Sequence, residues 1–217
     1  MKSKQYEKAR KSYQRLLEIH EQISGADSKG AIETKGELAT ALLHMRKTTQ
    51  AIELYRELLV DLPPNKSIEH SFRVSRHLQK LDFHEEATSF LSQAHEKLKD
   101  SDPDSSQYFK ASLLLGRARA MAAKQKFDSQ KNAEASTSDL FGKTELAAVF
   151  ELAEKEMTTG LDGLAKNDFP TKQQDKKQQD KIIEDTLLLL IDMNKILDRP
   201  EAVTKWQEKK SANPKND

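Results

Sequence analysis

The chain has 217 residues, of which 36 are basic and 35 acidic, so its formal net charge is only +1, and it contains no cysteine. The balanced charge argues against attraction of the whole protein to nucleic acid. The lack of cysteine excludes disulfides and cysteine-ligated metals. Residues 1–24 are too charged for a signal peptide and the longest apolar run, 187–191, is too short to span a bilayer, so we expect a soluble, cytoplasmic protein with neither a membrane nor a nucleic-acid partner.

The composition favours helices throughout. Seven Gly and six Pro leave few sharp turns, and the long segments are rich in Ala, Leu, Glu, Lys and Gln, which are good helix formers. In chain order we expect helices over residues 4–24, 29–45, from 48 or 49 to before 63, 66–81, a fifth that contains 87–94 and ends near 102, 105–125, from 144 to about 160, 179–197 and from 200 onward. The sequence therefore predicts an all-α chain.

The segments between these helices carry their own signals. Gly25 marks a turn, and Ser28 is the expected N-cap of the second helix. Pro200 opens the last helix at the first position, which proline favours. Residues 126–143 are small and polar and are expected to form an inserted loop. Residues 165–181 are expected to be a polar linker or the exposed start of the next helix, and residues 211–217 a frayed tail.

A pattern of small and large side chains recurs along the chain. Ala51, Tyr55 and Leu58 lie four and three residues apart, which places them on one face of a helix at about 3.6 residues per turn. The same order occurs 42 residues earlier, over residues 9–16, and a matching apolar set over residues 38–42 precedes Ala51 by 13 residues. Internal similarity at a period of 20–50 residues indicates stacked repeats. The residues expected to let neighbouring helices approach closely are Ala39, Ser75, Gly116, Ala51 and Ala87.

These residues resemble the tetratricopeptide repeat. The matching residues are Leu38, Ala39, Leu42, Ala51, Tyr55, Leu58 and Pro63 in one repeat, Val74, Ser75, Leu78, Ala87, Leu91 and Ala94 in the next, and Leu189, Met193, Ala202 and Trp206 in the last. The 42-residue offset is similar to the longer repeats of kinesin-light-chain-like members. Arg119 departs from the pattern, which has an aromatic or aliphatic residue there. The resemblance implies a right-handed superhelical stack of antiparallel helix pairs, with repeats over 1–164 and a terminal pair over 182–210.

The resemblance also implies a function, that of a non-catalytic scaffold or adaptor that binds a peptide or partner segment in its concave groove. The residues expected to face this groove are Thr40, His44, Phe72, Arg76, Lys80, Arg117 and Met121. Its three cations would suit an acidic peptide or a terminal carboxylate, because Arg pairs with carboxylates through two hydrogen bonds. The alternative is that these cations are ordinary solvated residues paired with Glu69, Glu85 or Glu86. No repeat carries the lysine and asparagine of the chaperone-type carboxylate clamp.

No pattern of catalytic or metal-binding residues emerges. His70, His77 and His84 recur every seven residues, which is about 10.5 Å along a helix and too far for two imidazoles to share one ion. We expect them to be incidental surface histidines. The chain has no glycine-rich phosphate loop and no nucleophile or metalloprotease motif, so we expect neither catalysis nor a metal or other cofactor. The large rings of Tyr13, Tyr55, Phe150 and Trp206 are expected to lie in the core.

Two other functions stay open from the sequence. The first helix has the pattern of the second helix of a pair but no partner before it, so its face at Leu16 is expected to be uncovered. The chain would then be a structural segment of a larger protein that docks neighbouring domains or self-associates through its open ends. The other alternative is an enzyme of an unrecognised helical class.

Overall fold

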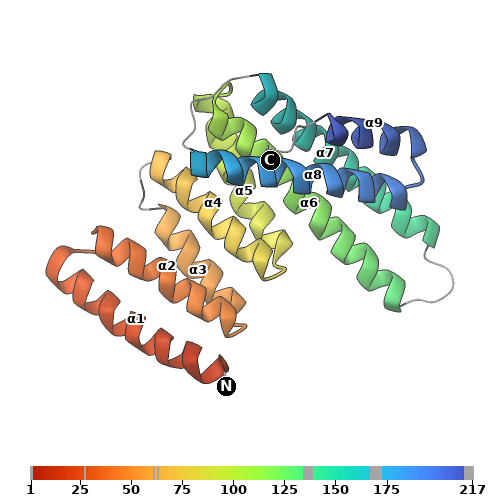
Figure 1. Cartoon of the computed structure of the whole chain (residues 1–217). Helices are drawn as coiled ribbons and strands as arrows, with labels where there is room; N and C mark the ends of the chain where they lie inside the picture. The colour runs from red at the N-terminus through yellow and green to blue at the C-terminus, as the bar shows by residue number, and fades with distance from the viewer. Residues whose placement is uncertain are drawn as a thin grey trace. The chain divides into compact units, whose positions relative to one another are not determined.

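The computed structural model describes residues 2–26, 28–60, 62, 64–133, 139–166 and 173–212, and within these ranges the regular structure is helical throughout (Figure 1). The helices are α1 (Lys2–Ser24), α2 (Lys29–His44), α3 (Thr48–Val60), α4 (Pro64–Lys80), α5 (His84–Ser101), α6 (Ser106–Ala133), α7 (Asp139–Lys166), α8 (Gln173–Ile196) and α9 (Pro200–Ser211). The predicted all-α fold is confirmed. The chain divides into two compact units, Met1–Glu86 and Ala87–Asp217, and each is described by itself.

Unit 1 begins with helices that follow one another through short turns. Gly25 has a φ of +84°, a conformation that glycine adopts without strain, and its amide bonds back to the carbonyl of Glu21. The Ser28 hydroxyl accepts a hydrogen bond from the Ala31 amide at 3.2 Å and so caps α2. The predicted turn and N-cap are both confirmed. Such tight turns make α1, α2 and α3 run antiparallel, each packed on the next.

The small and large residues of unit 1 meet as the sequence predicts. Ala39 and Ala51 are completely buried, and Tyr55 and Leu58 of α3 are each only 3% exposed. Ser75 on α4 is also buried, and its hydroxyl donates to the Ser71 carbonyl at 2.7 Å, which satisfies the donor inside the helix. One face of each of these helices is therefore committed to the core.

The same turn ends α2, α4 and α8. Arg46, Asp82 and Asp198 have left-handed φ values of 61°, 63° and 55°. The amide one residue later, at 47, 83 and 199, bonds in each turn to the carbonyl five residues before it at 2.9 Å. This is the Schellman arrangement, which ends a helix by satisfying its last carbonyls. The recurrence marks α2, α4 and α8 as equivalent helices, each leading into the second helix of a pair.

Unit 2 is organised around a close contact between α6 and α7. A Cβ atom on Gly116 would lie 2.5 Å from the Ala153 carbonyl oxygen, and one on Gly160 would lie 2.6 Å from the Leu113 Cβ. A Cβ on Gly163 would overlap the Phe109 ring. The close approach predicted at Gly116 is therefore confirmed, and two further glycines extend it.

Those two glycines overturn one expectation. The seventh helix was expected to fade at Gly160 and Gly163, but α7 continues through both to Lys166. Glycine in a helix interior normally costs stability relative to alanine. Here Gly160 lies against α6 backbone and Gly163 against the ring of Phe109, and a Cβ at either position would overlap these neighbours.

The expected loop over 126–143 is also wrong where the structure describes it. Helix α6 extends to Ala133 and α7 begins at Asp139, while 134–138 lie outside the described residues. Phe127 is only 8% exposed and belongs to the same core cluster as Leu146, so apolar packing continues along both helices. For 165–181, the second alternative holds from Gln173 onward, where α8 has already begun; 167–172 are not described. Helix α9 ends at Ser211, and 213–217 are also outside the described residues.

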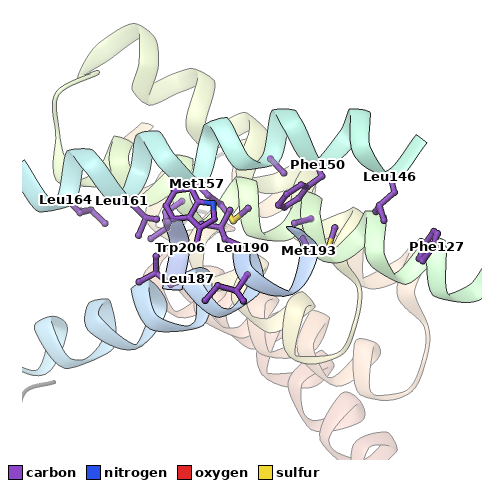
Figure 2. Packing of buried hydrophobic residues seen from close by; sticks show 14 residues of the cluster. Phe127, Leu146, Phe150, Met157, Leu161, Leu164, Leu187, Leu190, Met193 and Trp206 are labelled. Atoms are coloured by element: carbon purple, nitrogen blue, oxygen red, sulfur yellow. The ribbon is translucent and has the colours of Figure 1, made fainter. Parts of the chain in front are cut away.

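The core of unit 2 is closed by α8 and α9. Pro200 lies at the start of α9, as predicted. Trp206 is completely buried among side chains of α7 and α8, and its indole N–H donates to Glu154 at 2.9 Å (Figure 2). The hydrogen bond satisfies the one polar atom of the ring, so the indole can occupy the interior without leaving a donor unpaired. Phe150 and Trp206 are core residues, as expected.

Two alanine substitutions test this packing in opposite directions. Gly116→Ala places a methyl group against α7 backbone, so we expect the free energy of unfolding to fall by about 1–3 kcal/mol. Gly36→Ala on α2 meets no atom within 4 Å among the described residues beyond its own helix backbone, so we expect a gain of about 0.5–1 kcal/mol. Urea denaturation followed by circular dichroism measures both. Equal effects of the two substitutions would contradict the proposed α6–α7 contact.

Candidate functional site

A pocket of about 380 Å³ opens in unit 1 between side chains of α2, α3 and α4. Its apolar lining includes Ile32, Leu58 and Val74. Gly36 lies on the α2 wall, and a Cβ there would meet no atom within 4 Å among the described residues outside its helix backbone. The missing side chain therefore leaves open space at the α2 wall of the pocket rather than a close helix contact.

The walls of this pocket carry opposite charges. Glu33 and Glu37 line it from α2, and Arg73 lines it from α4. Arg73 lies 3.5 Å from Glu69, but both side chains are about two-thirds exposed, with 65% and 69% of their surfaces accessible. Exposed ion pairs of this kind contribute little stability. Arg73 can therefore exchange Glu69 for another carboxylate at low cost.

A row of cations continues from Arg73 along α4. Lys66, Glu69, Arg73, Arg76 and Lys80 follow one another at intervals of three or four residues, and all five are exposed. That spacing places them on one face of the helix. We call this row the α4 basic stripe; it contains one acidic residue among four basic ones.

Aromatic residues and hydroxyls fix the inner part of the pocket. The Thr40 and Tyr55 hydroxyls are 2.9 Å apart and share a hydrogen bond, and burial raises the pKa of Tyr55, which keeps the phenol neutral. The ring of His44 stacks on Tyr6 of α1 at a centroid distance of 4.4 Å and meets the edge of His77 at 5.6 Å. The three rings join α1, α2 and α4.

The histidines differ from their expected surface role. His77 and His70 line the pocket and are half-buried, and His84 is only 5% exposed. Burial lowers the pKa of all three below 6.5, and for His77 the charge on His44 lowers it further. Nε2 of His77 is buried and has no hydrogen-bond partner among the described residues. The prediction of incidental surface histidines is therefore wrong for His84, which is buried. In the described ranges no three His, Asp or Glu side chains lie close enough to hold a metal ion.

The expected groove residues of unit 1 separate into three kinds. Thr40 lines the pocket and His44 supports it through His77. Arg76 and Lys80 are exposed on the α4 basic stripe but do not line the pocket. Phe72 is only 8% exposed and belongs to the core, so its ring is not offered to a partner. The cause is its spacing, since Phe72 lies four residues after the buried Ile68 on the inner face of α4.

The other two expected residues, Arg117 and Met121, line a second pocket in unit 2 between α6 and α8. Arg117 lies 3.7 Å from Asp185 of α8. Arg119, which departs from the repeat pattern, lies 3.4 Å from Glu156 of α7. Burial raises the pKa of Glu156 to about 7, so this carboxyl is only partly ionised at neutral pH.

Sequence reasoning missed most of the pocket lining of unit 1. Glu33, Glu37, Arg73 and His70 look like ordinary helix-surface residues until α2 and α4 are placed beside each other. Gly36 carried the one available signal, because a glycine inside a helix has a packing or functional reason or costs stability. The sequence does not say which reason applies, because that depends on whether another part of the chain lies close to Gly36. In the structure no described neighbour lies within 4 Å of a Cβ at this position.

One part of the chain matches a known family model. Residues 1–59 match the family model of the tetratricopeptide repeat. This family generally provides non-catalytic scaffolds for protein interactions, which indicates a module of that kind in this part of the chain. The crystal structure of BtubC (BKLC) from P. vanneervenii is similar over 96% of this chain and 90% of its own, with 13% sequence identity and a TM-score of 0.43. No curated protein matches the chain. In the described ranges no helix has the length and apolar character needed to cross a membrane.

The buried position of His77 predicts a pH effect on stability. Because folding lowers its pKa, the unfolded chain binds a proton first as the pH falls through 6.5, so the free energy of unfolding decreases with acidification. His77→Gln removes this contribution. We expect the stability difference between wild type and variant, measured by urea denaturation, to shift in favour of the variant between pH 7.5 and pH 5.5. A difference that does not change with pH would show that His77 titrates normally in the folded protein.

Proposed function

We infer that this chain, whose residues 1–59 carry tetratricopeptide repeats, is a non-catalytic scaffold that holds a peptide or partner segment in the α2–α4 pocket. The observation that carries the proposal is the open space over Gly36, above an apolar lining of Ile32, Leu58 and Val74. A groove with an apolar floor and a few polar groups on its walls can hold a side chain while orienting the segment that bears it.

The charges favour a segment that is acidic along one edge. The α4 basic stripe offers Arg73, Arg76 and Lys80 beside the pocket, while Glu33 and Glu37 form the opposite wall. Carboxylates on the bound segment would be attracted by the first wall and repelled by the second. Such complementarity fixes the orientation of a partner more than it raises affinity.

Charge reversal on the stripe tests the proposal. Wild type, Arg73→Glu/Arg76→Glu and the control Arg56→Glu are each used to select peptides from a random 12-residue display library. Arg56 is exposed on α3 and does not line the pocket. We expect wild type and control to enrich acidic peptides and the double variant to bind those peptides at least roughly tenfold more weakly, with a weaker salt dependence.

A second variant separates binding from folding. Gly36→Leu places a larger side chain in the open space, where no described neighbour lies within 4 Å of a Cβ, and we expect it to abolish peptide binding while the unfolding midpoint stays at or above that of wild type. Peptides that bind the Gly36→Leu and charge-reversed variants as tightly as wild type would refute the pocket as the binding site.

A specific observation also favours self-association through α1. Leu16, Ile19 and Ile23 lie at helical spacing and are 40%, 49% and 77% exposed. In α3 the residue equivalent to Leu16 is Leu58, and it is only 3% exposed; α3 packs against both α2 and α4, whereas α1 packs against α2. The second candidate function is therefore docking of α1 against another copy of the chain, as part of a larger assembly.

The test of this second candidate is the mass of the chain in solution. Leu16→Gln/Ile19→Gln removes the apolar face of α1. Val60→Gln is the control, because Val60 is an isolated exposed hydrophobic residue: it is 81% exposed, and no other large hydrophobic residue of α3 is exposed. Sedimentation equilibrium should show concentration-dependent association for wild type and control, and a monomer for the double variant. A monomeric wild type at millimolar concentration would exclude self-association.

A further inference from the structure

The second pocket, in unit 2, has a volume of about 450 Å³ and is lined by α6 and α8. Its most unusual member is Arg117, whose side chain is only 14% exposed. Its nearest acidic partner, Asp185, is 3.7 Å away, which is beyond hydrogen-bond distance. Nε of Arg117 is buried and has no hydrogen-bond partner among the described residues.

An arginine in this state has capacity for another acceptor. A guanidinium carries five N–H donors in a planar fork that matches a carboxylate. A buried donor without a partner costs free energy, and an acceptor brought by a ligand recovers it. Burial lowers the pKa of Arg117, with Asp185 opposing that change, but arginine still remains protonated.

The surface beside Arg117 is apolar and partly uncovered. Leu188 is 45% exposed, and it lines the pocket together with Met121, Leu189 and Ile191. Packing in the core does not explain the aliphatic side chain of Leu188, because Leu187 and Leu190 are the residues of α8 that are buried in the core next to it. The pocket therefore offers one apolar contact and one cationic contact to the same ligand.

The remaining charges leave the pocket open to an anion. Asp192 lies 2.6 Å from Lys124 and is neutralised by it. Lys195 adds a second cation to the lining. Asp185 is the one acidic lining residue without so close a cation, and it sits 3.7 Å from Arg117 itself. The two lining cations, Arg117 and Lys195, equal the two lining carboxylates in number, and Lys124, which lies outside the lining, brings the net charge of these five groups to +1.

We propose that the α6–α8 pocket binds an acidic side chain of a partner segment that presents an aliphatic side chain on the same face. The carboxylate accepts hydrogen bonds from Arg117, and the aliphatic group covers Leu188 and Met121. The proposal rests on the inferred partner-binding role of the chain, but it does not depend on the α2–α4 pocket, which belongs to unit 1.

The minimal probe of this chemistry is 4-methylpentanoate, which joins a carboxylate to a 3-methylbutyl group. Titration into the full chain is followed by NMR of the Arg117 Nε–H and of the Met121 and Leu188 methyl groups. We expect all three signals to shift with 4-methylpentanoate, and much less with 4-methylpentanamide or with acetate, which each lack one of the two groups. Equal shifts with the amide would overturn the role of Arg117.

Variants identify the residues and separate this site from the other pocket. Arg117→Gln should abolish binding of 4-methylpentanoate, and Asp185→Asn, which removes the competing carboxylate and leaves the arginine in place, should strengthen it several-fold. Asp185→Asn keeps the test valid if Arg117→Gln fails to fold. Arg73→Glu/Arg76→Glu should bind the probe like wild type, so failure of the proposed α2–α4 site and failure of this one are distinguishable.

A peptide tests whether the ligand of the α6–α8 pocket is a segment of a partner protein rather than a small free acid. The blocked peptide acetyl-Ala-Glu-Ala-Leu-Ala-amide places its carboxylate and its leucine on one face of an extended chain. It should bind at least roughly tenfold more tightly than 4-methylpentanoate, and its Glu→Gln version should lose at least roughly tenfold in affinity. A peptide that binds no better than the small acid would refute a partner segment as the occupant.

Discussion

The contact between α6 and α7 is the constraint on which unit 2 depends. At three glycines the two helices approach so closely that a single methyl group on either would strike the other helix. Gly116 is followed directly by Arg117, so the position that α7 gives to α6 also sets where that guanidinium lies relative to Asp185. The core cluster of Trp206, Met157 and Leu190 then fills the space that α8 and α9 enclose against this pair (Figure 2).

At its helix contacts unit 1 has alanine where unit 2 has glycine. In both units other residues of the packed helices line a pocket. Ala39 and Ala51 bury one face of α2 and α3, and the Thr40–Tyr55 hydrogen bond lies where that face meets the pocket. The opposite side of α2, with Glu33 and Glu37, stays exposed. The unit 1 pocket is lined by α2, α3 and α4 and the unit 2 pocket by α6 and α8; of these helices, α2, α4 and α8 end in the same left-handed turn. Packing on one face of these helices thus leaves residues on another face to line the pockets.

Features governed by residues close in the sequence could be predicted, and those governed by distant residues could not. Ser28, Gly25 and Pro200 act within one turn of the helix they begin or end, so the sequence sufficed. The small and large residues of α2 and α3 recur with helical spacing and were also predictable. The expected loop at 126–143 failed because lysine, glutamine and alanine form helices as well as linkers, and because one core residue, Phe127, stands among the polar residues of 126–130. The partners of Arg117 and Arg119 are Asp185 and Glu156, which only the packing of α6 against α7 and α8 brings near.

The central claim, that α6 and α7 approach closely at glycine in unit 2, is tested most directly by proton–proton distances in solution. A nuclear Overhauser spectrum of the full chain resolves the α-protons of Gly116 and Gly163. The account predicts cross-peaks from Gly163 to the ring protons of Phe109 and from Gly116 to the side-chain protons of Met157. Glycine α-protons that show cross-peaks only within their own helix would contradict it.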